Sequence, residues 1–466
     1  MAPTTPDLAP PPVRGQPLPM LSVAVVCSLV GIWCIISSNL LGYETQYFPL
    51  ILSGVMLAFI SLFEIRVGLA VLLLTIGLSP EIELYGLKHF RYEDLIFPIV
   101  FLVWASKHVQ SRRRLTATDL KMPILILLFL SLFSSLNNHL YYGLELRTSL
   151  LRFGKGVEYF FIFLVVLNTL KGPRDLRAFI TLMIVSSAFV GLHGLVQWGI
   201  STETGVYRLS GPPGETANIL GGYYVFHMCI ALGLLVRARA SSRVFLIAYL
   251  GLMMIPFIMT LSRTSYVALF AGILVIWAMS RSSSIGWILV IIAVAVLLSP
   301  GYVTERMTSI LDTFTGDSPS SWRARMEGWK MFVPLALQSP LLGHGIGSRE
   351  LGAIDNEYVL QLNDLGVVGL LAFLWLIARC LRTSFRLHKL EESDRLLSGF
   401  AIGYLGGLAA LLVHSIGATT FTTIRTTEPF FFATGLLYVY WNHKQRSMKE
   451  PSFDHHAAPP PSGSAT

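Results

Sequence analysis

The chain has 466 residues, of which 53% are hydrophobic and 13% are charged, and its mean hydropathy is +0.62. This composition excludes a soluble globular protein, because many apolar segments approach the length of about 20 residues that crosses a bilayer core. The formal net charge of +8 does not indicate a nucleic-acid-binding protein, since the basic residues lie in loops between apolar segments and form no patch.

The apolar segments predict an all-α fold, a polytopic helical membrane bundle of about 12–14 transmembrane helices with one large loop that contains short helices. The predicted spans are 21–38, 47–63, 67–79, 95–105, 122–136, 157–170, 176–198, 217–236, 244–260, 264–279, 285–300, 365–377, 397–416 and 428–441. Segment 67–79 is short enough to be a re-entrant or tilted helix rather than a full crossing.

The predicted organisation has five parts. A proline-rich N-terminal segment, 1–20, and a C-terminal tail, 443–466, are expected to be disordered. An N-terminal transmembrane bundle, 21–300, precedes the long polar loop, 301–364, and the C-terminal transmembrane helices, 365–442, follow that loop. Lys and Arg are concentrated in the short loops on the side of both chain ends, so the positive-inside rule predicts cytoplasmic termini and an outward-facing long loop.

The cysteines do not predict a disulfide framework or a metal site. All four, Cys27, Cys34, Cys229 and Cys380, lie in or at the edge of apolar segments, as expected for small buried side chains. The sequence also contains no P-loop, no dinucleotide-binding fingerprint and no zinc-type ligand spacing. We therefore expect neither a cofactor nor a metal.

One arginine stands between two apolar segments with almost no loop around it. Arg263 lies in the sequence Ser262-Arg263-Thr264-Ser265, near the predicted membrane boundary. A charge drawn to the bilayer centre would cost roughly 2.5–3.5 kcal/mol on insertion scales, so an arginine at this position is expected to have a specific role. One interpretation is an arginine that snorkels at a tight turn. The other, which the small polar neighbours favour, is a binding pocket.

A second arginine precedes a glycine-rich and proline-rich turn. Arg208 is followed by Gly211, then by Asn218 and Gly221 at the start of an apolar segment. The free N–H groups of that helix start could face an anion, although an ordinary connector fits the pattern too. Two guanidiniums that reach one outer cavity would suit a diphosphate, since a charge pair at about 4 Å is worth roughly 4 kcal/mol at an effective dielectric of 20.

The long loop contains a predicted helix and a pair of acids. Trp322, Met326, Trp329 and Val333 recur at helical spacing, with Arg323, Arg325 and Lys330 off that stripe. This pattern predicts an amphipathic helix on the outer leaflet, or one that caps the bundle.

Further along, the sequence Asp355-Asn356-Glu357-Tyr358 places two carboxylates just before an apolar segment. One of the two is expected to accept a proton from an acceptor hydroxyl. Helix N-capping by Asp355 with Asn356 is the alternative. His344 is a further possible base, although a single histidine in a glycine-rich loop is a weak signal.

The order of these segments and their shared outer face resemble the O-antigen ligase and polysaccharide polymerase family. The resemblance is carried by Arg208-Leu-Ser-Gly with Asn218 and Gly221, Ser262-Arg263-Thr264-Ser265-Tyr266, Arg325 with Trp329, Pro340-Leu-Leu-Gly343 with Gly345 and Gly347, and Asp355-Asn356-Glu357-Tyr358. Members of this family are bacterial inner-membrane glycosyltransferases with a large periplasmic loop. They move a glycan from an undecaprenyl diphosphate carrier to an acceptor, without a nucleotide sugar and without needing a metal.

The resemblance implies roles for the candidate residues. Those implied to bind the carrier diphosphate are Arg208, Arg263 and Arg325, and those implied to act in catalysis are Arg263 with Asp355 or Glu357. The residues implied to support the site are Ser262, Ser265, Asn218, Asn356 and Tyr358. Ligases that use lipid A core commonly carry a histidine before the asparagine, where this chain has Asp355. This departure favours a polymerase of O-antigen or exopolysaccharide repeats.

The implied partners are an undecaprenyl-diphosphate-linked glycan, an acceptor glycan or lipid A core, membrane lipids and polysaccharide export or chain-length proteins, with no nucleic acid. Two alternatives stay open: a ligase that acts on lipid A core or a protein, and a transporter of bicarbonate or another small solute. Transporters place charges at the midplane of broken helices. The interior candidates here are few, Glu158, His193 and His414 among them, which favours the enzyme.

Overall fold

The computed structural model describes residues 64–84, 87–112, 114–142, 146–204, 208–212, 216–280, 301, 320–346, 354–390 and 394–449. The predicted spans 21–38, 47–63 and 285–300 lie outside the described residues, as do the predicted N-terminal segment 1–20 and residues 450–466 of the predicted tail.

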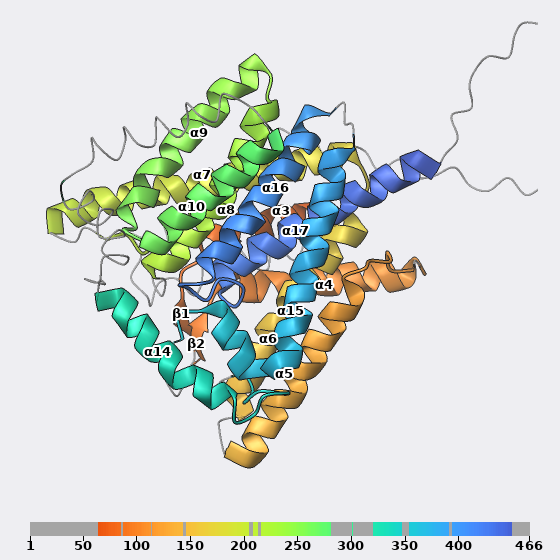
Figure 1. Ribbon diagram of the computed structural model, residues 1–466. Helices are drawn as coiled ribbons and strands as arrows, with labels where there is room; N and C mark the ends of the chain where they lie inside the picture. Colours follow the sequence, from red (N-terminus) through yellow and green to blue (C-terminus); the bar gives the residue numbers. More distant parts are fainter. Residues whose placement is uncertain are drawn as a thin grey trace, which may run out of the picture.

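The described part of the chain is a helical bundle with one small hairpin (Figure 1). In chain order its elements are α3 (Ile65–Leu78), β1 (Ile82–Leu84), β2 (Leu87–Phe90), α4 (Tyr92–Gln110), α5 (Lys121–Tyr142), α6 (Leu146–Thr169), α7 (Pro173–Thr204), α8 (Ala217–Arg237), α9 (Ala240–Met259), α10 (Arg263–Ser280), α14 (Ser320–Ala336), α15 (Glu357–Lys389), α16 (Arg395–His414) and α17 (Ile424–Lys449). Among these residues, six helices are long and apolar enough to cross a membrane: α7, α8, α9, α10, α15 and α16. The predicted fold class, a polytopic helical membrane protein, is confirmed.

Three details differ from the prediction. An antiparallel hairpin, β1 with β2, joins α3 to α4 in a chain predicted to be all-α. Helix α17 continues to Lys449, so the first residues of the predicted disordered tail are helical. Helix α15 begins at Glu357, inside the predicted loop, because its first turns bury the polar residues Asn363 and Asp364 against the protein. Hydropathy alone predicts a loop for such polar helical turns, even though they are buried.

Helices α8 and α16 cross at a contact between their backbones. A Cβ atom added to Gly233 of α8 would overlap the backbone of Gly403 of α16, and one added to Gly399 would lie 2.8 Å from the carbonyl oxygen of Gly233. Small residues allow this approach, which is a common way to pack membrane helices. The contact joins the end of α8 to the start of α16. The helices run antiparallel, so the start of α8 and the end of α16 also lie side by side, where Gly222 faces His414.

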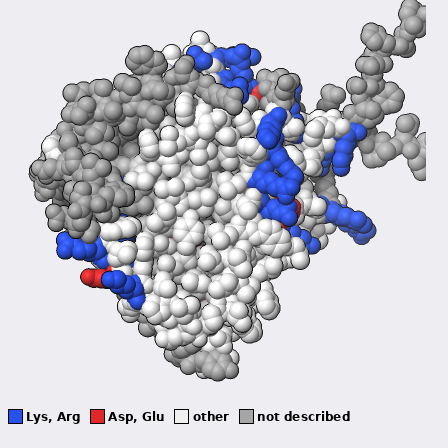
Figure 2. All heavy atoms as spheres, in the orientation of Figure 1, with Lys and Arg blue, Asp and Glu red and all other residues white. Residues whose placement is uncertain are grey.

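Basic residues mark the other end of the bundle. The ends of α8, α15 and α17 and the starts of α9 and α16 carry Lys and Arg, which gather at the upper right of Figure 2. Helices α8, α10, α15 and α17 all begin at the opposite end, which we call the pocket end. The bundle therefore separates a basic end from the end where the candidate residues lie.

Two glycines in left-handed conformations dock the turn after α14 onto α15. Gly366 has φ of +68° and interrupts α15, and a Cβ there would overlap the carbonyl oxygen of Leu341. Gly343 has φ of +69° and lies against the backbone of Asp364. Glycine adopts this conformation without steric penalty. The Pro340-Leu-Leu-Gly343 motif thus has a packing role, which places α14 across the pocket end.

Candidate functional site

A pocket of about 310 Å³ opens at this end of the bundle, within the size range of small-molecule sites. It is lined by Arg208, Asn218, Leu261, Arg263, Thr264, Ala324, Arg325, Gly328, Trp329 and Asp355. These residues come from the segment around the start of α8, the turn from α9 to α10, helix α14 and the residues before α15. The structure therefore brings together three arginines that are far apart in the sequence.

Arg208 is held by the ends of two helices. Its Nε donates a hydrogen bond to the carbonyl oxygen of Thr260, 3.1 Å away at the end of α9, and its Nη2 donates to Asn218 Oδ1 at 3.3 Å. The same Asn218 oxygen accepts a hydrogen bond from Ser262 Oγ at 3.0 Å, and Ser262 Oγ accepts one from Ser265 Oγ at 2.7 Å. Asn218, Ser262 and Ser265 thus form the network that orients Arg208, with only Asn218 reaching the pocket.

Arg263 is the first residue of α10, directly after a sharp turn. Leu261 has φ of +50°, which is uncommon for a residue with a branched side chain and allows α9 to reverse into α10 within a few residues. The carbonyl oxygen of Ser262 accepts the first bond of the new helix, from the Tyr266 N–H at 3.1 Å. Since Arg263 and Thr264 line the pocket, the positive end of the α10 dipole adds to the anion-binding character of the guanidinium.

Helix α14 brings the third arginine across the pocket. Arg325 Nε lies 3.7 Å from Asp355 Oδ2, and its Nη1 donates to Thr264 Oγ1 at 3.4 Å. Three guanidiniums and one carboxylate therefore line the pocket, and its formal charge is positive. The Asp355 side chain is 55% exposed, so it is accessible to an incoming molecule.

The second acid of the predicted pair does not line the pocket. Glu357 is fully buried, its Oε1 accepts from Gln361 Nε2 at 2.8 Å, and its Oε2 accepts from the Phe421 N–H at 3.0 Å and from Thr422 Oγ1 at 3.3 Å. Its own N–H donates to the carbonyl oxygen of Ser415 at 2.9 Å. Glu357 thus anchors the start of α15 to the loop 415–423.

The two neighbours of Glu357 have the same anchoring role. Asn356 Oδ1 accepts from the N–H groups of Tyr358 and Val359, so Asn356 is the helix cap, and its Nδ2 donates to the carbonyl oxygen of Ile416 at 3.0 Å. The Tyr358 hydroxyl donates to the carbonyl oxygen of Leu412 at 2.8 Å. The alternative expectation, capping by Asp355 with Asn356, is therefore observed for Asn356 and not for Asp355. Asn356 and Tyr358 instead fix the backbone that presents Asp355 to the pocket.

His344, a further possible base, lies elsewhere. It is 4% exposed and absent from the pocket lining, and its Nε2 lies 2.8 Å from the carbonyl oxygen of Leu335 near the end of α14. The histidine therefore fastens the turn after α14.

The predicted stripe on α14 divides between two faces. Trp329 lines the pocket and contacts Trp322 edge-on, with ring centroids 5.5 Å apart. Met326 and Val333, predicted on the same stripe, are 37% and 38% exposed and lie on a side of the helix that does not pack against the bundle. The buried contact comes from Phe332 and Ala336, which pack near Ile354 and Leu360. Periodicity identified the helix but could not distinguish a face that contacts protein from one that does not.

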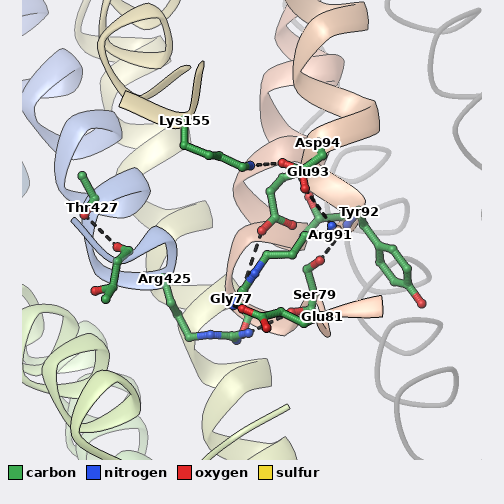
Figure 3. Close-up of polar contacts among 12 residues, drawn as sticks. Gly77, Ser79, Glu81, Arg91, Tyr92, Glu93, Asp94, Lys155, Arg425 and Thr427 are labelled. Atoms are coloured by element: carbon green, nitrogen blue, oxygen red, sulfur yellow. Dashed lines mark hydrogen bonds and ion pairs between the residues drawn. The ribbon is translucent and has the colours of Figure 1, made fainter. Parts of the chain in front are cut away.

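A buried ionic cluster, which sequence reasoning did not assemble, lies beside the hairpin (Figure 3). Arg425, in the first turn of α17, is fully buried and points at the end of α3, where its Nη1 donates to the carbonyl oxygen of Gly77 and its Nη2 to that of Ser79 at 2.8 Å. Lys155 of α6 pairs with Asp94 of α4, and with Glu158 at 2.9 Å.

The rest of the cluster comes from Glu81 and Arg91, which flank the hairpin, and from α4 and α17. Arg91 Nη2 pairs with Glu81 at 2.8 Å, and its backbone N–H donates to Asp94 Oδ2 at 2.7 Å. Glu93 and Glu428 are fully buried. The available signal was the spacing of Arg425 and Glu428, an arginine and an acid one helical turn apart at the start of an apolar segment. The cluster holds α3, α4, α6 and α17 together.

Comparison with known proteins gives a family match for one segment of the chain. No curated protein matches the chain. Residues 248–374 match the family model described as O-antigen ligase. The matched segment runs from within α9 to within α15 and contains Arg263, Arg325 and Asp355, whereas Arg208 and the ionic cluster residues lie outside it. This segment, about a quarter of the chain, is therefore similar to the O-antigen ligase family.

Proposed function

We propose that this protein is a glycosyltransferase of O-antigen or exopolysaccharide assembly, which transfers a glycan from undecaprenyl diphosphate to an acceptor glycan. The observation that carries the proposal is the convergence of Arg208, Arg263 and Arg325 with the exposed Asp355 on one pocket, at the end of the bundle away from the basic end. By the positive-inside rule that basic end is cytoplasmic, so the pocket faces the periplasm and both termini face the cytoplasm of a bacterial inner-membrane protein.

The arrangement supports an inverting, metal-independent transfer. The guanidiniums of Arg208 and Arg263 bind the diphosphate through planar pairs of N–H donors, and Arg325 adds a third. Asp355 accepts the proton of the acceptor hydroxyl while the hydroxyl oxygen forms a bond to the anomeric carbon of the donor glycan. The bond from that carbon to the phosphate oxygen breaks at the same time, and the arginines stabilise the negative charge that develops on the leaving diphosphate.

A polymerase is favoured over a ligase. The aspartate at position 355 stands where ligases that act on lipid A core commonly carry histidine, and the pocket is open enough at Asp355 for a glycan acceptor. Ligation onto lipid A core or a protein is the alternative within the same chemistry, since the donor half of the site would be identical.

A transporter is the second candidate, and the buried ionic cluster is the observation in its favour, because charges inside a membrane bundle often mark transport paths. The basic residues of the cluster, Arg91, Lys155 and Arg425, are each paired with carboxylates or with backbone carbonyls, which favours a structural role. Solute uptake by vesicles free of lipid-linked glycan would support the transporter instead.

Purified protein incubated with undecaprenyl-diphosphate-linked repeat units is the direct test. A polymerase should produce a ladder of products, because each product is a new acceptor, and gel electrophoresis with glycan staining resolves that ladder. A single transfer onto added lipid A core, with no ladder, would identify a ligase. Absence of any transfer with either acceptor contradicts the proposal.

The two acids should respond differently to loss of charge. Asp355→Asn should lower kcat by about 10²–10⁴-fold with little change in KM, because only the proton acceptor is lost. Glu357→Gln should instead lower the free energy of unfolding by about 1.5–3 kcal/mol, because it weakens hydrogen bonds to a buried charged acceptor. Glu327→Gln, on the exposed side of α14, is the matched control and should change neither. Full activity of Asp355→Asn would contradict the role of Asp355 as the base.

A further inference from the structure

One apolar side of helix α14 remains exposed in the structure. Met326 and Val333 are 37% and 38% exposed, and Leu337, one residue beyond the helix end, is 64% exposed. At about 100° per residue these three side chains share one side of the helix. We refer to Met326, Val333 and Leu337 as the lateral face.

The lateral face lies between the two other faces of α14. The inner face, with Arg325, Trp329 and Phe332, packs toward the bundle and is about 100° away around the helix. The side opposite the inner face is exposed and mixed, with the charged residues Arg323, Glu327 and Lys330 beside Met331 and Pro334. Figure 2 shows basic residues with an acid gathered where Figure 1 places α14, which runs crosswise to α16 at the pocket end.

The lateral face continues into apolar surface on a candidate membrane span. The turn after α14 lies on α15, where the Val367 N–H donates to the carbonyl oxygen of Pro340 at 2.8 Å. Next to this contact Leu341 is 66% exposed, and α15 carries a row of exposed apolar side chains. That row is Val367, Val368, Leu371, Leu374 and Trp375. The exposed apolar surface of α15 has the composition of a surface that faces lipid.

We infer that α14 is an interfacial membrane anchor, with its lateral face inserted among the lipids of the outer leaflet and its polar side in water. A helix across the end of a bundle, with water on one side, protein on another and apolar residues between them, fits a bilayer interface. Arg323 and Lys330 border the lateral face and can pair with lipid phosphates. The pocket on the inner side of α14 then opens at the level of the lipid head groups.

Resting on the proposed function, this placement gives α14 a role in substrate entry. A lipid-linked donor could present its diphosphate to Arg325 and Arg263 while its tail stays in the leaflet, so that the anchor fixes the height of the pocket relative to the substrate. Val333→Ser with Leu337→Ser should therefore raise KM for the lipid-linked donor without changing kcat.

Spin-label depth measurement tests the anchor without any glycan. Single cysteines at Val333, Met331 and Glu327 are labelled in protein whose Cys27 and Cys34 are replaced by serine, leaving the buried Cys229 and Cys380 in place. In phospholipid nanodiscs the Val333 label should collide more with oxygen than with a water-soluble nickel chelate. The Glu327 label should show the reverse, and so should the Met331 label, because Met331 is exposed on another side of α14.

Three outcomes overturn the inference: nickel-favoured collisions at Val333, immobilisation of its label in detergent as well as in nanodiscs, or dipolar broadening that indicates a second copy. None of these outcomes bears on glycan transfer. A failed anchor would leave the proposed function intact, and a failed transfer assay would leave the depth measurement intact.

Discussion

Replacing Arg263 with alanine should abolish glycan transfer while leaving the folded protein intact. Arg263 lines the pocket at the positive end of α10, and removal of one donor that stabilises a developing negative charge lowers the rate on the order of 10²–10³-fold. Arg263→Lys should recover only part of this loss, because an ammonium keeps the charge but not the planar pair of donors. The measurement is product length with purified lipid-linked repeats at equal amounts of protein.

The control is Arg382→Ala, since Arg382 is an exposed arginine of α15 outside the pocket. A double-mutant cycle adds a sharper criterion. If Arg208 and Arg263 bind one diphosphate, the double alanine variant should lose less activity than the product of the two single losses. Long products from Arg263→Ala, or strictly independent losses, would show that the two guanidiniums do not share a ligand.

The pocket arginines could be predicted because the sequence isolates them. A charge at position 263, between two apolar segments, raises the free energy of placing that part of the chain near the bilayer. This cost can be recognised from the sequence alone. Convergence of Arg208, Arg263 and Arg325 was expected only from their common membrane face. Their meeting at one pocket depends on the turn at Leu261 and on the path of α14, and neither follows from hydropathy.

The acids show where sequence reasoning stops. Asp355 and Glu357 are two residues apart and chemically alike, so the sequence left both as candidates for the base. The structure separates them by burial, because the loop 415–423, which is distant in sequence, supplies the donors that bind Glu357. The structure divides the stripe on α14 for a related reason, since Trp329 and Met326 are both apolar and only tertiary packing tells their faces apart.

The ionic cluster could not be assembled from the sequence, because its charges come from four separate stretches of the chain. In the sequence, Arg425 is a single arginine in the short interval between two apolar segments. In the structure it is fully buried and closes the end of α3, whose last carbonyl groups have no partners within their own helix and carry the negative end of its dipole. Arg425 is therefore buried because it donates to carbonyl groups at the end of α3, more than three hundred residues earlier in the chain.

Arg425→Ala should accordingly cause the largest loss of stability of any single change proposed for this protein. The substitution leaves the carbonyl oxygens of Gly77 and Ser79 without these donors, and it removes a buried positive charge from a cluster that contains Glu93 and Glu428. Breaking a buried charged interaction costs about 3–5 kcal/mol, against a total of about 5–15 kcal/mol for a typical folded protein.

The expected result for Arg425→Ala is a large fall in the unfolding temperature in detergent and in the amount of protein in the membrane. Arg243→Ala is the matched control, because Arg243 also donates to a backbone carbonyl, that of Ala238 at 3.2 Å, but does so in an exposed position. Its loss should change stability by less than about 0.5 kcal/mol. Arg425→Lys should fall between the two, since one ammonium can satisfy the charge but not both carbonyl groups with the geometry of a guanidinium. An unfolding temperature for Arg425→Ala equal to that of Arg243→Ala would mean that the guanidinium does not hold α17 to α3, and that the cluster owes its burial to packing alone.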